Sequence, residues 1–207
     1  MRFHYRVAYV ILNVLARLLF GLVTRGGERV PKEGGVIIAS NHISYFDPPM
    51  VGCGVPRELH YMAKEELFKN PVFAAIIRSY NAIPLRRSVG DMAAFRKAVK
   101  LIRQGRAVLM LPEGTSSLSG RLLKAKAGVG MIGAMTSAPI VPVYVEGTNS
   151  LSKAFWRKRR FRVSCAEPVI PSDYEDEAGD PKKQYQRITD EVMRRIASLA
   201  KENQEAR

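Results

Sequence analysis

The chain contains few of the residues that build metal centres and disulfide frameworks. Only two of its 207 residues are cysteines, Cys53 and Cys165, and they stand far apart without the spacing of metal ligands. The three histidines form no HExxH motif and no other pattern typical of a metal site. We therefore predict neither a disulfide framework nor a metal, and the simplest setting is a reduced, cytoplasmic one.

Acidic side chains are scarce beside basic ones. Lysine and arginine number 33 against 19 aspartates and glutamates, and the formal net charge is +14. The isoelectric point is close to 10.1. Such an excess indicates an anionic partner, which can be nucleic acid, an anionic membrane or an acidic substrate. The charge by itself does not choose among them.

Internal repeats and long low-complexity tracts are also missing, and the length suits one domain with a sizeable core. Short apolar runs alternate with helical patterns, which is typical of an α/β fold. Helices are expected over residues 89–104, where apolar side chains share one face, and from Asp180 and Pro181 onward. Residues 171–179 are expected to form a surface connection. Strands are expected at residues 35–39, 59–63, 107–111, 140–145 and 161–165.

The motif NHISYFD, residues 41–47, directly follows the apolar run 35–39. An imidazole can take a hydroxyl proton near neutral pH, and a nearby carboxylate can fix its tautomer and stabilise the imidazolium. His42 and Asp47 are thus candidates for a general base and the group that orients it. The alternative is structural: Asp47 precedes two prolines and could cap a helix, with His42 in an ordinary loop.

A second polar segment follows another apolar run. Residues 108–111 are apolar, and after them come Pro112, Glu113 and small or hydroxylated residues up to Ser117. In α/β sheets the carboxyl ends of the strands carry the site. We therefore expect His42 and Glu113 to face one crevice.

Four segments together resemble the 1-acylglycerol-3-phosphate acyltransferase family. They match its NHxxxxD motif, its second block ending in arginine, its FPEGTRS motif and its VPV strand. One match would be weak evidence, but four in the same order are specific. The resemblance implies an α/β fold with a mixed central sheet flanked by helices. The segments are NHISYFD (41–47), NAIPLRR (81–87), LPEGTSS (111–117) and IVPVYVEG (140–147).

The resemblance implies acyl transfer from a thioester, carried on acyl carrier protein or coenzyme A, to the free hydroxyl of a lysophospholipid. With 1-acylglycerol-3-phosphate as acceptor, the product is phosphatidic acid. His42 would remove the hydroxyl proton while Asp47 holds the imidazole. Neither a cofactor nor a covalent enzyme intermediate is needed. A nucleophilic Ser44 would demand a hydrolase arrangement that the sequence does not otherwise support.

The same resemblance supplies candidates for substrate binding. Arg87 matches the arginine that ends the second block, and Lys126 resembles a lysine that follows the third, so both are candidates for the acceptor phosphate. Gly114 and Thr115 would place the glycerol, and Glu113 would bind an acceptor hydroxyl or orient the cations. Apart from the resemblance, such arginines and lysines would be ordinary solvated surface charges.

Two positions depart from the family pattern. Asn81 stands where the family usually has glycine, and Ser116 stands where it usually has arginine. Ser116 removes a cation from the third block, so it receives no phosphate-binding role and the acceptor head group stays open. An acyltransferase for a different lysophospholipid and a non-catalytic protein that binds anionic lipid are the alternatives. A nucleic-acid-binding module is least favoured, and we expect no nucleic-acid partner.

The N-terminus is strongly apolar. Residues 7–23 hold only Asn13 and Arg17 as strongly polar side chains. As a helix rising about 1.5 Å per residue, residues 5–24 would reach about 30 Å, the thickness of a hydrocarbon core. Arginines at both flanks and the regular spacing of Asn13, Arg17 and Gly21 favour a helix that lies in one leaflet over a simple span.

The domain and location predictions follow from this helix. Residues 1–26 are expected to be a membrane-associating helix and residues 27–207 the acyltransferase domain, at the cytoplasmic face of the cell membrane. No Ala-x-Ala-like site follows the apolar stretch, which argues against a cleaved signal peptide.

A second candidate for membrane contact is the segment FWRKRRFR, residues 155–162. Aromatic rings interleaved with cations suit the headgroup region of an anionic membrane. The same composition suits contact with nucleic acid phosphate, and a solvated loop leading into a strand is the structural alternative. The apolar N-terminus favours lipid.

Overall fold

The computed structural model describes residues 1–86, 92–117, 119–150, 160–177 and 179–205. Its strands are β1 (Val23–Arg25), β2 (Val36–Ser40), β3 (Leu59–Lys64), β4 (Ala82–Leu85), β5 (Ala107–Met110), β6 (Ile140–Glu146) and β7 (Arg162–Cys165). Its α-helices are α1 (Phe3–Phe20), α2 (Asp47–Gly54), α3 (Pro71–Ser79), α4 (Met92–Arg103), α5 (Gly128–Thr136) and α7 (Pro181–Glu205). Short 3₁₀ helices are η1 (Gly27–Arg29), η2 (Glu65–Phe68) and η3 (Pro171–Tyr174).

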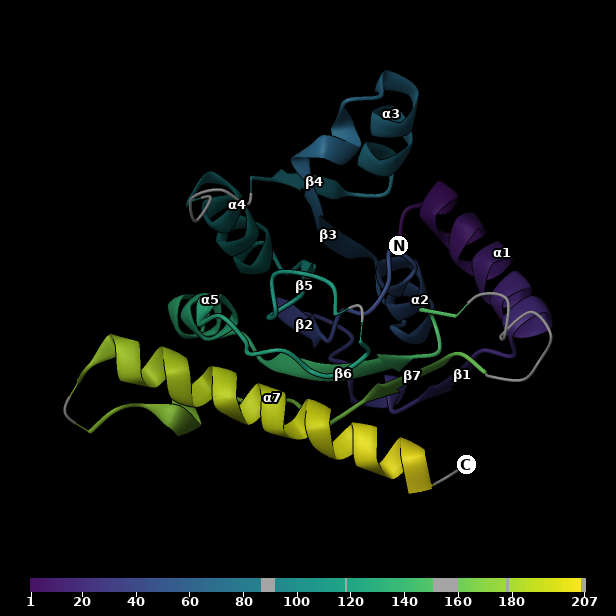
Figure 1. Ribbon diagram of the computed structural model, residues 1–207. Coiled ribbons are helices and arrows are strands. Elements are labelled where there is room, and N and C mark those ends of the chain that lie inside the picture. Colours follow the sequence, from purple (N-terminus) through teal and green to yellow (C-terminus); the bar gives the residue numbers. More distant parts are fainter. Residues whose placement is uncertain (87–91, 118, 151–159, 178, 206–207) are drawn as a thin grey trace.

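The strands form one seven-stranded sheet in the order β1-β7-β6-β2-β5-β3-β4 (Figure 1). Neighbouring strands run parallel except β6 and β7, which are antiparallel. The predicted α/β fold with a mixed central sheet and flanking helices is confirmed. Because β6, β2 and β5 are parallel neighbours, the loops that follow them leave the same edge of the sheet.

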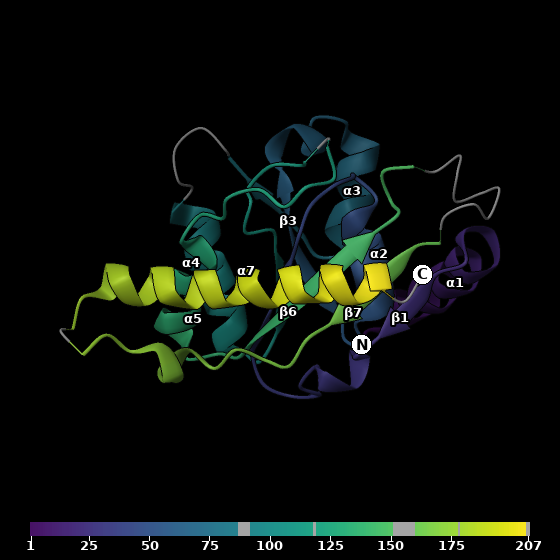
Figure 2. The ribbon, with the colours of Figure 1, turned by 60° about the horizontal axis from the view of Figure 1, so that its bottom comes forward.

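Helices cover both faces of the sheet, so its central strands are buried on both sides. Every residue of β2 is buried. Val36 and Ile38 pack into the cluster that contains Met50 of α2. Ile37 and Ala39 point the other way, into a cluster that includes side chains of α4, α5 and α7. Figure 2 shows α7 crossing over β6 and β7.

The five strands expected from the sequence are present, each within one or two residues of its expected bounds. Two strands were missed. β4 contains Pro84, which the edge position of this strand tolerates because one side of an edge strand makes no ladder bonds. β1 has only three residues, paired with β7. Such a short segment carries no periodic signal.

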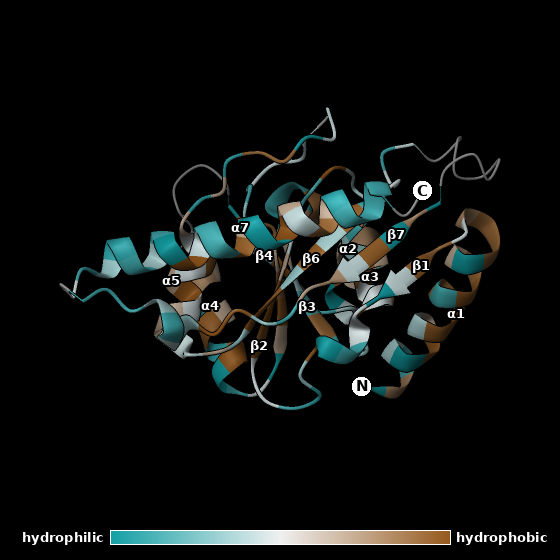
Figure 3. Ribbon diagram, turned by 90° about the horizontal axis from the view of Figure 1, so that it is seen from below, coloured by the Kyte–Doolittle hydropathy of each residue, from teal (hydrophilic) through white to brown (hydrophobic). Residues whose placement is uncertain are grey.

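Helix α1 ends earlier than expected. The helix was expected over residues 5–24, but it stops at Phe20, where Gly21 takes a left-handed conformation with φ of 59°. Only Tyr5 and Ala16 of its 18 residues are buried. By length and composition alone the helix could cross a membrane, and Figure 3 shows how much of it is hydrophobic. The division into residues 1–26 and 27–207 stays a prediction.

The segment predicted to contact lipid at residues 155–162 lies partly outside the described residues, because 155–159 are not described. The prediction is wrong for Phe161, which is fully buried and stacks on Phe20 with ring centroids 4.8 Å apart. The ring belongs to the core beside the end of α1. Arg160 is exposed.

Candidate active site

His42 and Asp47 form a buried pair directly after β2. The Nδ1 atom of His42 lies 2.9 Å from Oδ2 of Asp47. The exposed fraction of the side chain is 7% for His42 and 0% for Asp47. A carboxylate can only accept, so Nδ1 donates and Nε2 keeps its lone pair. Nε2 has no hydrogen-bond partner among the residues that the structure describes, which leaves it free to take a proton.

Asp47 also accepts hydrogen bonds from donors other than His42. The same Oδ2 accepts hydrogen bonds from the backbone N–H groups of Ile43, at 2.6 Å, and Ser44, at 2.7 Å. Helix α2 begins at Asp47, but the carboxylate turns back to these preceding residues, so the alternative of a simple helix cap does not describe it. The Ser44 hydroxyl accepts from the N–H of Phe46, and within the described residues no hydrogen bond joins it to His42.

Two residues that hold this pair were missed in the sequence. Thr148 follows β6, and its hydroxyl donates to Oδ1 of Asp47 from 101 positions along the chain. Asn41 exchanges two hydrogen bonds with the backbone of Val145, at 3.0 and 2.8 Å. A polar residue at the end of a predicted strand is the signal that could have found Thr148. The bonds of Asn41 could not be found without knowing that β2 and β6 are neighbours.

Glu113 lies beside His42, as expected, but its contacts are to the backbone. Oε1 accepts from the N–H of His42 at 3.3 Å, and Oε2 accepts from the N–H of Leu123 at 3.2 Å. The N–H of Ser117 donates to the carbonyl of His42 at 2.7 Å. Burial raises the pKa of Glu113, and the two backbone donors oppose that shift. The loop after β5 therefore forms hydrogen bonds with both the backbone N–H and the backbone carbonyl of His42.

The candidates for substrate binding lie near this loop where they are described. Gly114 has φ of 69°, and a side chain there would meet Cε and Nζ of Lys126 at 3.3 Å. Lys126 thus lies over the loop that holds His42, with its side chain exposed. Thr115 is exposed next to Gly114. Arg87 lies outside the described residues.

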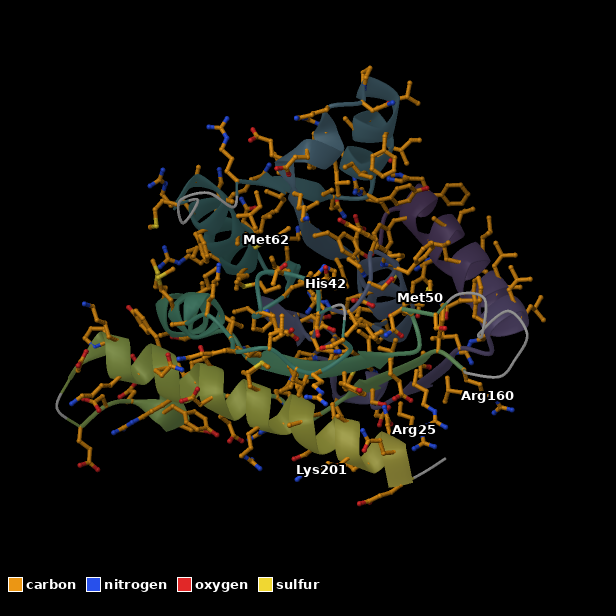
Figure 4. All side chains as sticks on the ribbon, viewed as in Figure 1. Arg25, His42, Met50, Met62, Arg160 and Lys201 are labelled. Carbon is orange, nitrogen blue, oxygen red and sulfur yellow. The ribbon has the colours of Figure 1, made fainter. Side chains whose placement is uncertain are left out.

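His42 lines a largely apolar cavity of about 360 Å³. In Figure 4 His42 lies near the middle of the molecule, between the labelled side chains of Met50 on α2 and Met62 on β3. The cavity runs between α1, the start of α2, β3 and α3. It presents an apolar wall to any group that reaches Nε2. Its lining includes Tyr9, Leu12, Pro49, Met62, Phe73 and Ile77.

Other groups near the cavity do not supply a nucleophile or a metal site. Burial raises the pKa of the Cys53 thiol to about 11, opposed by the charge of Arg17, so this thiol stays protonated at neutral pH. Over the described part of the chain, no three His, Cys, Asp or Glu side chains lie close enough to hold a metal ion.

A family model described as Acyltransferase matches residues 22–146, more than half of the chain. The chain belongs to the acyltransferase family. The matched region contains His42, Asp47 and the Glu113 loop, and the resemblance inferred from the four sequence blocks is confirmed.

Individual relatives agree with this assignment. A 1-acyl-sn-glycerol-3-phosphate acyltransferase of Bacillus subtilis is 29% identical over 94% of this chain and 96% of that protein. A lysophospholipid acyltransferase of mouse, LPCAT4, is 32% identical over 70% of this chain and 29% of its own. The crystal structure of PlsC, the 1-acyl-sn-glycerophosphate acyltransferase of Thermotoga maritima, superposes with a TM-score of 0.71 at 27% identity, covering 97% of this chain and 84% of that one.

The structure of this acyltransferase explains one departure from the family pattern. Asn81 has φ of 66°, a conformation that favours glycine and that asparagine tolerates best among other residues. Its amide donates to Glu58 and to the carbonyl of Leu59, at 3.0 and 3.1 Å, and its oxygen accepts from Arg2. Asn81 thus adopts the backbone conformation that the usual glycine would have. Its side chain adds hydrogen bonds that link the start of α1 to β3.

Proposed function

We propose that the protein transfers an acyl group from a thioester to the free hydroxyl of 1-acylglycerol-3-phosphate, forming phosphatidic acid. The observation that carries the proposal is the buried His42–Asp47 pair. Nε2 of His42 has no hydrogen-bond partner among the described residues, and its side chain lines an apolar cavity. A proton acceptor beside an apolar cavity suits a hydroxyl and an acyl chain that must meet away from water. The proposed donor is acyl carrier protein or coenzyme A thioester.

The proposed reaction needs one proton transfer in each direction. Nε2 of His42 takes the proton of the acceptor hydroxyl as its oxygen bonds to the thioester carbonyl carbon. The tetrahedral intermediate then collapses, the carbon–sulfur bond breaks, and the proton passes from the imidazolium to the leaving thiolate. Asp47 stabilises the imidazolium and is held in place by hydrogen bonds from Ile43, Ser44 and Thr148. No metal, resident cofactor or covalent enzyme intermediate takes part in this scheme.

The acceptor phosphate is proposed to bind Lys126 and Arg87. Lys126 supports this because its side chain lies over Gly114, next to the loop that holds His42. Gly114 and Thr115 are proposed to place the glycerol. For Glu113 the backbone contacts favour a positioning role over direct binding of an acceptor hydroxyl, because both of its oxygens already accept N–H donors.

The proposed location is the cytoplasmic face of the cell membrane, with α1 lying in one leaflet. The exposed apolar surface of α1 supports membrane association. The Arg17 guanidinium donates one hydrogen bond to Thr24 at 3.3 Å, outside the helix. A simple span would bury the charge of this arginine at a cost, which favours a helix in one leaflet. An anionic leaflet fits the net charge of +14.

A second candidate is the same chemistry on another lysophospholipid. Ser116 stands in place of the usual arginine, so the third block offers one cation fewer for a phosphate monoester. The relative named as a lysophospholipid acyltransferase supports this reading. A non-catalytic protein that binds anionic lipid would not need the hydrogen bonds that orient Nε2 of His42.

The test is acyl transfer to 1-acylglycerol-3-phosphate in vesicles, with acyl carrier protein and coenzyme A thioesters assayed separately. We expect product from the wild type and a loss of about 10²–10⁴ in kcat for His42→Ala, with vesicle binding retained. His60→Gln is the matched control, because His60 is a half-buried histidine of β3 that does not line the cavity. Turnover by His42→Ala at the wild-type rate would show that His42 is not the general base. Product only with other lyso-lipids would select the second candidate.

A further inference from the structure

Helix α3 carries an apolar surface against which no described part of the chain packs. Most of its nine residues are apolar, yet only Ala74 is buried. Val72 is 70% exposed, Phe73 44% and Ile76 50%. Single exposed apolar side chains are ordinary, but three large ones within two turns of a short helix form a patch that needs a partner.

A second exposed apolar group lies on the loop between His42 and Asp47. Tyr45 is 69% exposed and Phe46 is 43% exposed. Neither side chain holds the buried pair, because Asp47 is held by backbone N–H groups and Thr148. The ammonium of Lys64 lies 5.7 Å from the centre of the Tyr45 ring. Amphipathic aromatic rings beside cations are typical of the headgroup region of a membrane.

The cavity connects these two groups with α1. Side chains of α1, of the His42 loop and of α3 line it together. On α3 the lining residues are Phe73 and Ile77, whereas the exposed Val72 and Ile76 each come one position earlier. One position is about 100° around a helix, so the apolar surface continues from the cavity wall to the outside of α3. At its start α1 also touches α3, where His4 contacts the carbonyl of Ser79 at 3.2 Å.

Several cations lie beside this combined surface, together with the exposed Glu66 of η2. Lys69 is exposed just before α3, and Arg78, near its end, lies over the Phe68 ring at 5.1 Å. Arg6 is exposed at the start of α1, whereas Arg2 there is paired with Glu58. Cations whose stems lie on apolar groups can reach phosphates while the apolar groups enter the lipid. This charge favours an anionic membrane over an apolar protein partner.

We propose that α3, together with Tyr45 and Phe46, forms a second membrane contact besides α1, so that the cavity beside His42 opens onto the leaflet. The inference rests on the proposed function, because a membrane lipid has to reach His42. A lyso-lipid would then enter sideways between α1 and α3, with its acyl chain passing from leaflet to cavity without crossing water. The loop that positions the base would also rest on the membrane.

The first test measures depth in the membrane and needs no activity. The chain has one tryptophan, Trp156, so Trp156→Phe provides a background without tryptophan. In that background Val72→Trp is compared with Ile170→Trp, because Ile170 is an exposed apolar residue in the segment between β7 and α7. Vesicles contain phosphatidylglycerol and phosphatidylcholine brominated on its acyl chains. We expect the bromines to quench most of the emission from Val72→Trp and little from Ile170→Trp. Equal quenching, or none at position 72, would overturn the proposal.

The second test measures the consequence for lipid use. In the double variant Val72→Asp and Ile76→Asp we expect vesicle affinity to fall by about tenfold or more, since charge opposes entry into the leaflet. Transfer to vesicle-borne acceptor should fall with it, while transfer to acceptor in detergent micelles stays within about twofold of wild type. Ile170→Asp is the matched control and should change neither.

Three results of the second test contradict the proposal or separate it from the proposed function. Unchanged vesicle binding and transfer by the double variant would overturn the second contact. A wild-type dimer that the double variant converts to a monomer in sedimentation would assign the patch to a subunit interface and overturn it as well. No transfer by the wild type in either vesicles or micelles would refute the proposed function, and the quenching experiment would still decide the membrane contact.

Discussion

The two sides of the cavity are held in place by different forces. On the sheet side, His42 and Asp47 are buried, and Asp47 accepts hydrogen bonds from a ring nitrogen, two backbone N–H groups and a hydroxyl. On the outer side, α1 and α3 expose most of their apolar surface and bury three residues between them, Tyr5, Ala16 and Ala74.

The difference fits two separate demands. A proton acceptor works only when its reacting atom is fixed to within a fraction of an ångström, which buried and fully satisfied hydrogen bonds achieve. A lipid enters more easily past a surface that is apolar and weakly attached. Substitutions on the sheet side should therefore alter kcat. Substitutions on the outer side should alter the preference among lipids and the rate of transfer to acceptors in vesicles.

Asp47→Asn should have the largest effect. Oδ2 of Asp47 accepts from His42, Ile43 and Ser44, and an amide oxygen in its place can still accept all three hydrogen bonds, but the substitution removes the negative charge. The imidazolium that forms when His42 takes the proton would then lose its charged partner, which raises the barrier to proton transfer. We expect kcat to fall by about 10²–10⁴ with the fold retained, measured by single-turnover assays and thermal unfolding. Activity within a few-fold of wild type would show that the charge of Asp47 does not stabilise the imidazolium.

Thr148→Val should have a smaller effect of the same kind. It removes the hydroxyl donor to Asp47 at nearly constant volume, and the cost of leaving a buried acceptor unsatisfied is about 1–3 kcal/mol. We expect about tenfold lower kcat with little change in KM. Thr148→Ser keeps the hydroxyl and should restore most of the rate. If Thr148→Ser is as slow as Thr148→Val, packing of the methyl group and not the hydrogen bond is responsible.

Gly52→Ala tests the cavity between the two sides. A Cβ at Gly52 would lie 2.5 Å from the Tyr61 hydroxyl, which is hydrogen-bonded to the hydroxyl of Tyr5 at 2.9 Å. We expect the displaced Tyr61 ring to narrow the cavity and lower the use of long acyl thioesters several-fold relative to short ones, as measured by competition between chain lengths.

The matched variant for this test is Gly52→Ala combined with Tyr61→Phe. It removes the hydroxyl that the new methyl group meets, so it should recover the wild-type preference, and Tyr61→Phe alone is its control. An unchanged chain-length profile in Gly52→Ala would show that the acyl chain does not reach this part of the cavity.

Glu58→Gln should have the smallest effect, a loss of stability at neutral pH that disappears in acid. Burial acts to raise the pKa of Glu58, but hydrogen bonds from Asn81 and Arg2 outweigh it and lower the pKa from 4.5 to about 2. A carboxyl whose pKa is lower in the folded state stabilises the protein above its unfolded pKa, and this contribution is lost as the pH falls from about 4.5 towards 2. The stabilisation concerns the attachment of α1 to β3 through Arg2.

The measurement is the unfolding temperature as a function of pH in both proteins. The wild type should lose stability more steeply than Glu58→Gln over this acid range, and the two should run parallel at neutral pH. Other carboxylates titrate in both proteins, so the difference reports Glu58 alone. Parallel curves throughout would show that the ion pair with the half-exposed Arg2 adds nothing measurable.

Much of the site could be predicted because its main parts stand at the ends of strands. His42 and Glu113 were placed in one crevice from two apolar runs followed by polar loops, and the structure joins them by a hydrogen bond of 3.3 Å. The backbone role of Glu113 could not be predicted, since it depends on the path of the loop to Leu123. Phe161 was misplaced because an aromatic residue among cations looks the same in sequence whether it packs inward or outward.

The sequence by itself determined the family, five of the seven strands and the His42–Asp47 pair, because apolar strand segments and the spacing of His42 and Asp47 are local properties of the chain. Only the tertiary structure decided which distant residues support that pair and which surfaces remain uncovered. Thr148 reaches Asp47 because β6 lies beside β2 in the sheet. The order of the strands in the sheet cannot be read from their order along the chain. The apolar residues of α3 look like core residues in the sequence, and only their lack of packing partners in the fold assigns them to the outside.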